Sequence, residues 1–494
     1  MFKKLLLDFA LLVILIIAAL VAVFVYGLNY VNSTEFADTI KNKIKSQLNT
    51  DITFSEHSIS FNHLILKNIT IPNPKAAVGE NLLAVEEVKL TYSLMSFYQG
   101  RYEVSEALIT KPVIKLRQSK EGSLILPVDL AQLKTTLATA KGVEKPAEVP
   151  LSFLLPNIKV VGAEVECLAE DGATLFKAEN ANILASYKQQ GTEQSAQGDL
   201  TINVVTVMPG LKITNVKSPL KFEKDILSLT EIKGSVYNGS LKGNVTLNTK
   251  ASPMTYETKV DLDSVDMSAL MADVGSDAQT LLGRLQLDFT GKGNLDAPKE
   301  VIGSGSFKIS EAQVPKLKKL QLLGNLAGVS ALKEGKFEHV DATYQIAQQK
   351  VQLAPLSIRS PNLNITMNGP VGFDKSLNLN GAVQLDPAAI QLLLNLAGLK
   401  SEDGKSLPVE VKGTTQEPKV SISGRLIDDI LAMDPAALIN KGTQLMDQFF
   451  KTKSDAPTDP NAPSEGKKNI LDGFNNHFKK KTQTPEPTPA PAAP

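Results

Sequence analysis

Hydrophobic and polar residues alternate along most of this chain, with the period of two that is typical of β-strands with one buried face. The alternation is clearest in KSLNLNGAVQL, where Leu377, Leu379, Val383 and Leu385 share one face with Gly381. Short alternating segments separated by turn signals predict strands that follow one another in a meander. The pattern therefore predicts a mainly β fold with an elongated, mostly antiparallel sheet and a few helices.

The same alternation recurs along the chain, and its hydrophobic members are Leu64, Leu66, Ile69, Ile71, Leu90, Tyr92, Leu94, Ile202, Val204, Leu241, Val245, Leu247, Leu285, Leu287, Phe289, Leu363, Ile365 and Met367. The phase of the alternation changes at Asn68, which predicts a bulge there. Asn238-Gly239 is a hairpin signal, and we interpret Gly291-Lys292-Gly293 and Gly303-Ser304-Gly305 as hairpin turns rather than phosphate-binding loops.

Helical patterns are fewer. Helical spacing of hydrophobic residues or suitable composition predicts helices over 34–48, 129–141, 264–283 and 315–333. Two more segments begin with Asp-Pro, an aspartate cap followed by a proline in the first turn, and they predict helices over 387–399 and 435–450. The helix over 387–399 is apolar nearly all round, so we expect it to be buried or to cover an apolar surface.

One segment is long and apolar enough to cross a bilayer. Phe9–Leu28 contains no charged residue, and as a helix of 20 residues it spans about 30 Å, the thickness of a hydrocarbon core. No small-x-small cleavage site follows it, so we interpret it as a retained transmembrane anchor rather than a signal peptide. Lys3 and Lys4 favour a cytoplasmic N-terminus, which places the rest of the chain outside the cytoplasm.

These features predict a linear domain organisation. After Phe450 the composition becomes proline-rich and typical of a disordered tail, in which NILDGFNNHFKKK is either part of a solvated linker or a docking peptide for another envelope protein. The predicted regions are a cytoplasmic N-terminus (1–8), the transmembrane helix (9–28), an N-terminal β region (29–141), a linker (142–150), a middle β-rich region (151–299), a C-terminal β region (300–450) and the tail (451–494).

Composition excludes several classes of function. Lys and Arg together equal Asp and Glu at 52 each, so the chain has no basic field for nucleic acid. Its single cysteine, Cys167, excludes an internal disulfide framework. Aromatic residues are only 5%, without tryptophan, which suits surfaces made of Leu, Ile and Val.

Candidate chemistry is scarce. The four histidines, His57, His63, His339 and His477, lack the spacing of a zinc site. Cys167 lies in the alternating segment EVECLAE, so we interpret it as a packed strand residue rather than a nucleophile. We therefore expect neither a catalytic residue nor a metal or other cofactor, and we predict that the protein is not an enzyme.

A long sheet with one apolar face must bury that face, and the residues leave two arrangements open. The first is a set of β-sandwich domains with closed cores. The second is a sheet curled into a groove whose aliphatic wall suits acyl chains, because such ligands need burial rather than directed hydrogen bonds. For the groove, the candidate lining residues are Leu285, Leu287, Phe289, Leu363, Ile365, Met367, Leu377, Leu379, Val383 and Leu385.

Two blocks of the chain resemble the AsmA family of envelope proteins. The first follows the transmembrane segment with YVNSTEFADTIKNKIKSQLNTDITFSEHSISF, LILKNITIPNP, VKLTYSL and ITKPVIKLRQSKEGSLIL, over roughly 1–126. The second runs from GSGSFKISEAQVPKL to SLNLNGAVQL, over roughly 300–386, whereas the middle fits only in its strand-rich style. Family members often carry Asp-Gly followed by Asn-Trp, where this chain has Glu121-Gly122-Ser123-Leu124.

The resemblance implies a single-pass protein of a bacterial inner membrane, anchored by residues 9–28, with most of its chain in the periplasm. It also implies a groove similar to that of bridge-like lipid carriers and a function in passive phospholipid transfer or homeostasis between the two membranes. Membrane phospholipids would then be its ligands. The alternative is a scaffold or assembly factor for outer-membrane proteins that binds no lipid.

Overall fold

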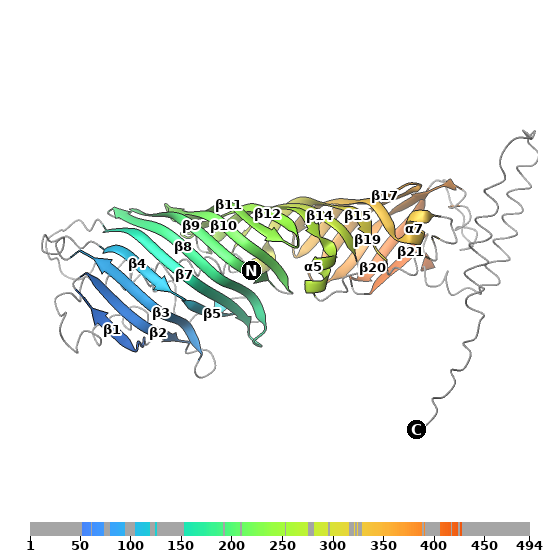
Figure 1. Ribbon diagram of the computed structural model, residues 1–494. Coiled ribbons are helices and arrows are strands. Elements are labelled where there is room, and N and C mark those ends of the chain that lie inside the picture. The colour runs from blue at the N-terminus through green and yellow to red at the C-terminus, as the bar shows by residue number, and fades with distance from the viewer. Residues whose placement is uncertain are drawn as a thin grey trace, which may run out of the picture. The chain divides into compact units, whose positions relative to one another are not determined.

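The computed structural model of the chain is shown in Figure 1. The predicted transmembrane helix 9–28, the helices over 34–48, 129–141 and 435–450, the linker and the tail all lie outside the residues that it describes. The described residues are 52–60, 62–73, 80–93, 104–118, 124–125, 153–190, 193–207, 210–251, 253–274, 281–294, 297–315, 321, 324, 329–387, 390, 406–415, 417–422 and 425–426.

The fold is mainly β, as predicted, and its strands belong to one large sheet that is mostly antiparallel. The described strands are β1 (Glu56–Ile59), β2 (His63–Pro72), β3 (Asn81–Tyr92), β4 (Val104–Thr110), β5 (Val113–Gln118), β6 (Leu124–Ile125), β7 (Phe153–Ala169), β8 (Thr174–Gln190), β9 (Glu193–Val207), β10 (Leu211–Glu223), β11 (Ile226–Val236), β12 (Gly239–Asn248), β13 (Thr255–Asp266), β14 (Leu282–Asn294), β15 (Ile302–Gln313), β16 (Lys336–Ala347), β17 (Lys350–Ser360), β18 (Leu363–Gly372), β19 (Ser376–Leu385), β20 (Leu407–Thr414), β21 (Pro418–Ile422) and β22 (Arg425–Leu426). The described helices are α5 (Met267–Asp273), α7 (Ser330–Glu334) and the 3-10 turn η3 (Pro298–Glu300).

The chain divides into two compact units. Unit 1 comprises residues 1–278, 285–305 and 346–349, and unit 2 comprises residues 279–284, 306–345 and 350–494. Each unit is described by itself below.

In unit 1, strands β7 to β13 pair antiparallel in chain order, and they lie side by side in Figure 1. Strands β1 to β4 form a second antiparallel series. The two series join through parallel pairs, because β4 and β5 both run alongside β7. Lys111 and Pro112 link β4 to β5 and keep this ladder continuous, since Lys111 N donates to Val161 O and Glu164 N donates to Pro112 O, both at 2.8 Å.

The strands of unit 1 change the phase of their alternation part of the way along. In β2 the buried residues are Leu64 and Leu66 before Asn68, and Ile69 and Ile71 after it. Asn68 has a φ of +50°, which confirms an irregularity there. The register between β2 and β3 nevertheless continues unchanged across it, so the irregularity is not a bulge with one extra residue on one strand.

Similar switches occur in neighbouring strands, at residues with positive φ inside a strand: Gly162, Asn180, Asn215, Glu231 and Ser264. Several are Asn or Gly, which tolerate this backbone conformation best. The register of β8 with β9, and of β9 with β10, is the same on both sides of the switch. Matched switches therefore keep the hydrophobic residues of adjacent strands on one common face, although the sequence changes phase.

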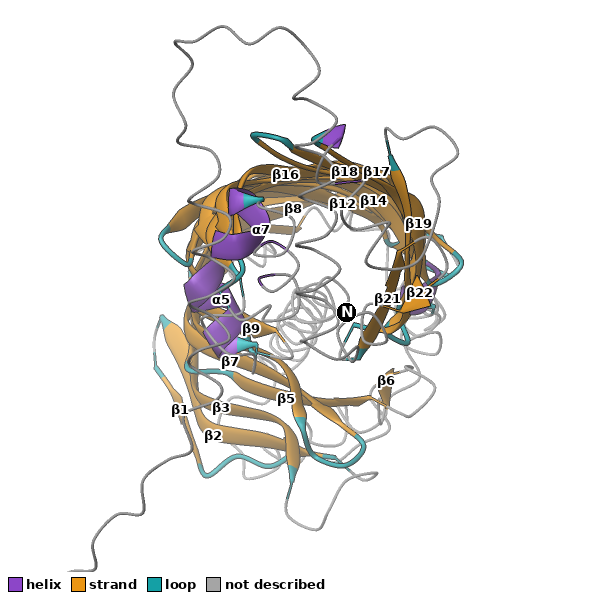
Figure 2. Ribbon diagram, turned by 90° about the vertical axis from the view of Figure 1, so that its right-hand side faces the viewer, coloured by secondary structure: helices purple, strands orange, loops and turns teal. Residues whose placement is uncertain are grey.

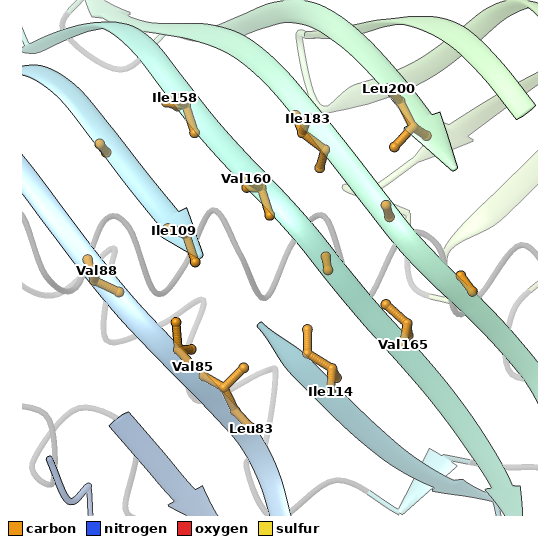
Figure 3. Packing of buried hydrophobic residues seen from close by; sticks show 14 of the residues in the cluster. Leu83, Val85, Val88, Ile109, Ile114, Ile158, Val160, Val165, Ile183 and Leu200 are labelled. Carbon is orange, nitrogen blue, oxygen red and sulfur yellow. The ribbon is translucent and has the colours of Figure 1, made fainter. Parts of the chain in front are cut away.

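That common face forms the core of unit 1. The close view in Figure 3 shows hydrophobic side chains of β3, β4, β5, β7, β8 and β9 lying next to one another across the strands. Many are completely covered: Ile114, Val160 and Val205 are 0% exposed. Cys167 is 1% exposed and lies opposite Leu116, which confirms that it is a packed strand residue.

In unit 2, strands β17 to β22 pair antiparallel in chain order. Figure 2 shows these strands following one another along an arc, from β17 and β18 to β19 and then β21. A register shift lies between Leu353 and Leu356 in β17. It brings Leu356 and Ile358 to the same face as Val351 and Leu353, which a regular alternation would not do.

The predicted turns need correction. The hairpin near Asn238 is confirmed, but its two positive-φ residues are Tyr237 and Asn238, and Gly239 already belongs to β12. Gly291-Lys292-Gly293 and Gly303-Ser304-Gly305 are not turns, because they lie inside β14 and β15. A Cβ atom on Gly291 would lie 2.4 Å from the Phe289 ring, and one on Gly303 would lie 2.5 Å from it. Gly291 and Gly303 leave room for the Phe289 ring, so their interpretation as turn residues was wrong.

The predicted helix over 264–283 was too long. β13 pairs with β12 as far as Asp263 and ends at Asp266, and the Asp266 side chain caps α5 by accepting from the N–H groups of Ser268 and Ala269. The helix ends at Asp273, and β14 begins at Leu282. Within the predicted helix 315–333, the structure describes α7 at its C-terminal end. At the start of 387–399, Ile390 N donates to Asp386 O at 3.0 Å, as in a first helical turn, and Ile390 is 1% exposed.

Candidate functional site

An uncharged face of β17 to β20 in unit 2 contains most of the predicted lining residues. Cross-strand pairing places Leu363 opposite Leu385, and Ile365 opposite Val383. Directly paired residues point to the same side of a sheet, so these side chains share one face. Met367 and Leu379 continue that face, with Gly381 opposite Met367.

The exposure of these predicted residues is graded. Leu363, Met367, Leu379, Val383 and Leu385 are between 3% and 9% exposed. Ile365 and Leu377 are partly exposed. The structure therefore assembles the seven predicted residues of β18 and β19 into one aliphatic surface, which we call the unit 2 apolar face.

The face also includes residues that the sequence analysis missed. Leu356 and Ile358 of β17 lie opposite Met367 and Ile365. Leu407, Val409 and Val411 of β20 lie opposite Val383, Gly381 and Leu379. The alternation in LPVEV was a usable signal for β20, whereas the shift at Ala354-Pro355 hides the pattern of β17.

The opposite side of these strands is polar. Asn364 Nδ2 donates to Gln384 Oε1 at 3.0 Å. Lys412 Nζ lies 2.8 Å from Glu410 Oε2. These four residues alternate along their strands with those of the apolar face, so they point to the opposite side of the sheet. The sheet therefore has an aliphatic side and a solvated side here.

The three remaining predicted residues, Leu285, Leu287 and Phe289, belong to β14 and are counted with unit 1. Leu285 is 9% exposed, while Leu287 and Phe289 are partly exposed. They alternate on one side of β14 and continue to Gly291 and Gly293. A Cβ atom on Gly293 would lie 2.8 Å from the Tyr256 hydroxyl, so the Tyr256 side chain of β13 reaches this side of β14.

The described residues offer little reactive chemistry. In that part of the chain, no group of three or more His, Cys, Asp or Glu side chains could hold a metal ion. Burial raises the pKa of Tyr187 to about 12, so its phenol stays neutral at physiological pH. None of the helices in the described ranges is both long and apolar enough to span a bilayer.

The polar contacts of unit 1 are structural in character. The least exposed ion pair among the described residues joins Arg117 of β5 to Glu80, which immediately precedes β3, with 2.6 Å between Nη2 and Oε2. Tyr237 Oη accepts from Lys212 N at 2.9 Å and donates toward Asp273 Oδ2 at 3.2 Å, which fixes the end of α5 against the β11–β12 hairpin. The ion pair holds two strands together, and the Tyr237 hydroxyl holds a hairpin to a helix.

Comparison with protein families finds a match to the AsmA family. The AsmA family model matches residues 1–191 and again residues 170–355, and so it also covers the middle region, whose own sequence resembles the family only in its strand-rich style. Residues 356–386, part of the second block of resemblance, lie beyond the matched range. No curated protein and no solved structure was found to match the chain.

Proposed function

The chain belongs to the AsmA family, and from this membership together with its apolar face we propose that it binds phospholipids by their acyl chains and transfers these lipids passively. The observation that carries the proposal is the cross-strand alignment of aliphatic residues on β17 to β20, with a polar surface on the other side of the same strands. Such a surface suits a ligand that needs burial without hydrogen bonds.

Transfer of this kind requires no catalytic group. An acyl chain that leaves a bilayer for water loses about 0.8 kcal/mol of favourable free energy per exposed methylene. If the chain passes directly from the bilayer to an aliphatic protein surface, most of this cost is avoided. The protein therefore lowers the barrier to lipid movement by keeping the chain covered, and the direction follows the lipid gradient.

The position in the cell is part of the same proposal. Residues 9–28 anchor the chain in a bacterial inner membrane, and the sheet lies in the periplasm, where the unit 2 apolar face forms the wall of a groove. The arc of β17 to β21 in Figure 2 is compatible with such a wall. The tail 451–494 is available to bind another envelope protein.

The full-length protein, solubilised in a mild detergent, tests the proposal. We expect native mass spectrometry to find bound phospholipid, and we expect the protein to move a fluorescent phospholipid between vesicles. Ile365→Asp and Leu377→Asp place a charge on the partly exposed part of the unit 2 apolar face and should reduce both signals at least fivefold, because burying an unpaired charge against an acyl chain is unfavourable.

Asn378→Asp is the matched control. Asn378 is exposed, and it neighbours Leu377 but points to the other side of β19, so the same charge there should leave lipid binding unchanged. If Ile365→Asp and Leu377→Asp unfold the protein while Asn378→Asp does not, the face is a closed core. Natively folded wild-type protein without lipid would instead favour the scaffold function.

A further inference from the structure

Charged residues on the polar side of the unit 1 sheet form rows, because cross-strand pairing places them directly opposite one another. Two rows of three charged residues between β1 and β8 alternate in sign, and they are Glu56–Lys67–Glu87 and Lys115–Glu166–Lys177. Opposite charges in direct pairs stabilise a sheet, whereas like charges destabilise it. These two rows therefore contribute to the stability of the fold.

One row on β10, β11 and β12 has a single sign of charge. The register places Lys217 opposite Lys233, and Lys233 opposite Lys242, and the three strands lie side by side in Figure 1. All three lysines are exposed. Val216, next to Lys217 in β10, is 7% exposed and belongs to the apolar side, so the lysines point to the polar side. We call Lys217, Lys233 and Lys242 the lysine row.

Nearby carboxylates neutralise the lysine row only in part. Glu231 Oε2 lies 3.8 Å from Lys233 Nζ, and these side chains are 74% and 68% exposed. Asp261 lies opposite Lys242 in the register, and its Oδ2 atom is 3.8 Å from Lys259 Nζ. Among the described residues, the other two lysines of the row form no ion pair. The row therefore carries excess positive charge.

The three charges are close enough to act together. Adjacent strands lie about 4.8 Å apart, so the row extends over about 10 Å, which is similar to the Debye length of about 8 Å at physiological ionic strength. Mutual repulsion of the ammonium groups destabilises the sheet, and an anionic partner above the row would remove this repulsion. A local arrangement that opposes stability is typical of a functional surface.

The residue types favour phosphate over carboxylate groups on the partner. Bidentate recognition of carboxylates relies on arginine, and residues 211–248, which contain β10 to β12, include no arginine. Lysine binds phosphate as a point charge. Because the row is exposed along the surface of a sheet, it suits an extended phosphate-bearing surface, such as the head groups of an anionic bilayer, to which clusters of lysines are attracted.

We propose that the lysine row on the polar side of β10 to β12 docks unit 1 onto the anionic phospholipid head groups of a bilayer surface. This inference goes beyond the proposed function, because it concerns the polar side of the sheet and requires no acyl chain to leave the membrane. Docking of this kind would hold unit 1 close to a membrane surface.

The full-length protein in phosphatidylcholine nanodiscs tests the proposal. Vesicles of phosphatidylcholine alone, or of an equimolar mixture of phosphatidylcholine and phosphatidylglycerol, are added, and co-sedimentation of the protein with the vesicles is measured. We expect binding to the mixed vesicles only, and we expect this binding to weaken as the salt concentration rises. The triple row variant, with Lys217→Gln, Lys233→Gln and Lys242→Gln, should bind at least about tenfold more weakly.

The matched control removes three positive charges elsewhere in unit 1. Lys188, Lys224 and Lys250 are exposed and lie at or near strand ends, so a variant with glutamine at these three positions should bind within about twofold of the wild type. Thermal unfolding gives a second measurement. Because the row variant loses like-charge repulsion, it should be at least as stable as the wild type.

Several outcomes would overturn bilayer docking. Equal binding to both kinds of vesicle, or an equal loss of binding in the control variant, would mean that the lysine row is not the determinant. A row variant that unfolds below the wild-type temperature would give these lysines a role in the fold. If mixed vesicles do not bind, while inorganic phosphate or polyglutamate protects the row from amine acylation, the partner is another anion. Each of these outcomes leaves the proposed lipid transfer intact, because the row variant retains the unit 2 apolar face.

Discussion

The Arg117–Glu80 ion pair makes a quantitative prediction about how the start of β3 is held to β5. These strands share only two residue pairs, Leu83 with Ile114 and Ala84 with Val113, and the ion pair lies beyond them. The Arg117 and Glu80 side chains are 19% and 15% exposed. Among the described residues, Arg117 Nε and Glu80 Oε1 have no further hydrogen-bond partner, so each charge depends on the other.

The magnitude follows from the geometry. At 2.6 Å between the charged atoms and an effective dielectric constant of about 20, the attraction is about 6 kcal/mol, and it is offset by the cost of removing both charges from water. Removal of one partner leaves the other charge mostly shielded from water and without compensation, and for fully buried charges this costs about 3–5 kcal/mol, which we take as the upper range. Replacement of both by apolar residues removes the attraction and the desolvation cost together.

We therefore expect Arg117→Met alone, and Glu80→Met alone, to destabilise this region by up to about 3–5 kcal/mol, and the double variant to lie within about 1 kcal/mol of the wild type. Hydrogen–deuterium exchange of peptides from β3 and β5 measures the local free energy of opening, and circular dichroism checks that the sheet is retained. Lys67→Met is the control, because Lys67 forms an exposed pair with Glu56 at 3.0 Å and should cost less than about 1 kcal/mol. Single variants that each cost under about 1 kcal/mol and add in the double would refute the reasoning.

Three further predictions concern unit 1. Gly291→Ala places a Cβ atom against the Phe289 ring and should destabilise by about 1–3 kcal/mol, and Phe289→Leu should recover most of this loss in urea unfolding followed by circular dichroism. Burial raises the pKa of Tyr187 from 10 to about 12, so its contribution to stability is complete below pH 10 and is lost as the pH rises toward 12. Absorbance titration at 295 nm of the wild type and of Tyr187→Phe should differ by one phenol that titrates near pH 12. A Tyr187 that titrates near pH 10 would contradict its burial. Tyr237→Phe removes the hydroxyl that contacts Asp273 and two backbone groups and should speed amide exchange in α5 by roughly five- to twentyfold, equivalent to about 1–2 kcal/mol, whereas unchanged exchange would mean that the hydroxyl does not hold the helix.

Much of the fold could be predicted because alternation is a local property. Leu377, Leu379, Val383 and Leu385 fall on one face of any strand that contains them, whatever the partner strands are. The same reasoning correctly identified Cys167 as a packed strand residue. It failed at Gly291 and Gly303, because a glycine that makes room for a ring from the same sheet has the same local signature as a glycine in a turn.

The sequence by itself determined the mainly β class, the aliphatic character of one face and the family. Only the tertiary structure decided which strands lie side by side, how the phase switches at Asn68, Asn180 and Asn215 are matched across strands, and which part of the face of unit 1 is closed. The reason is that exposure depends on partners that are distant in the chain. Leu66 and Leu241 are both leucines in similar alternating segments. Leu66 is buried in the core while Leu241 is partly exposed, because different neighbours pack around them.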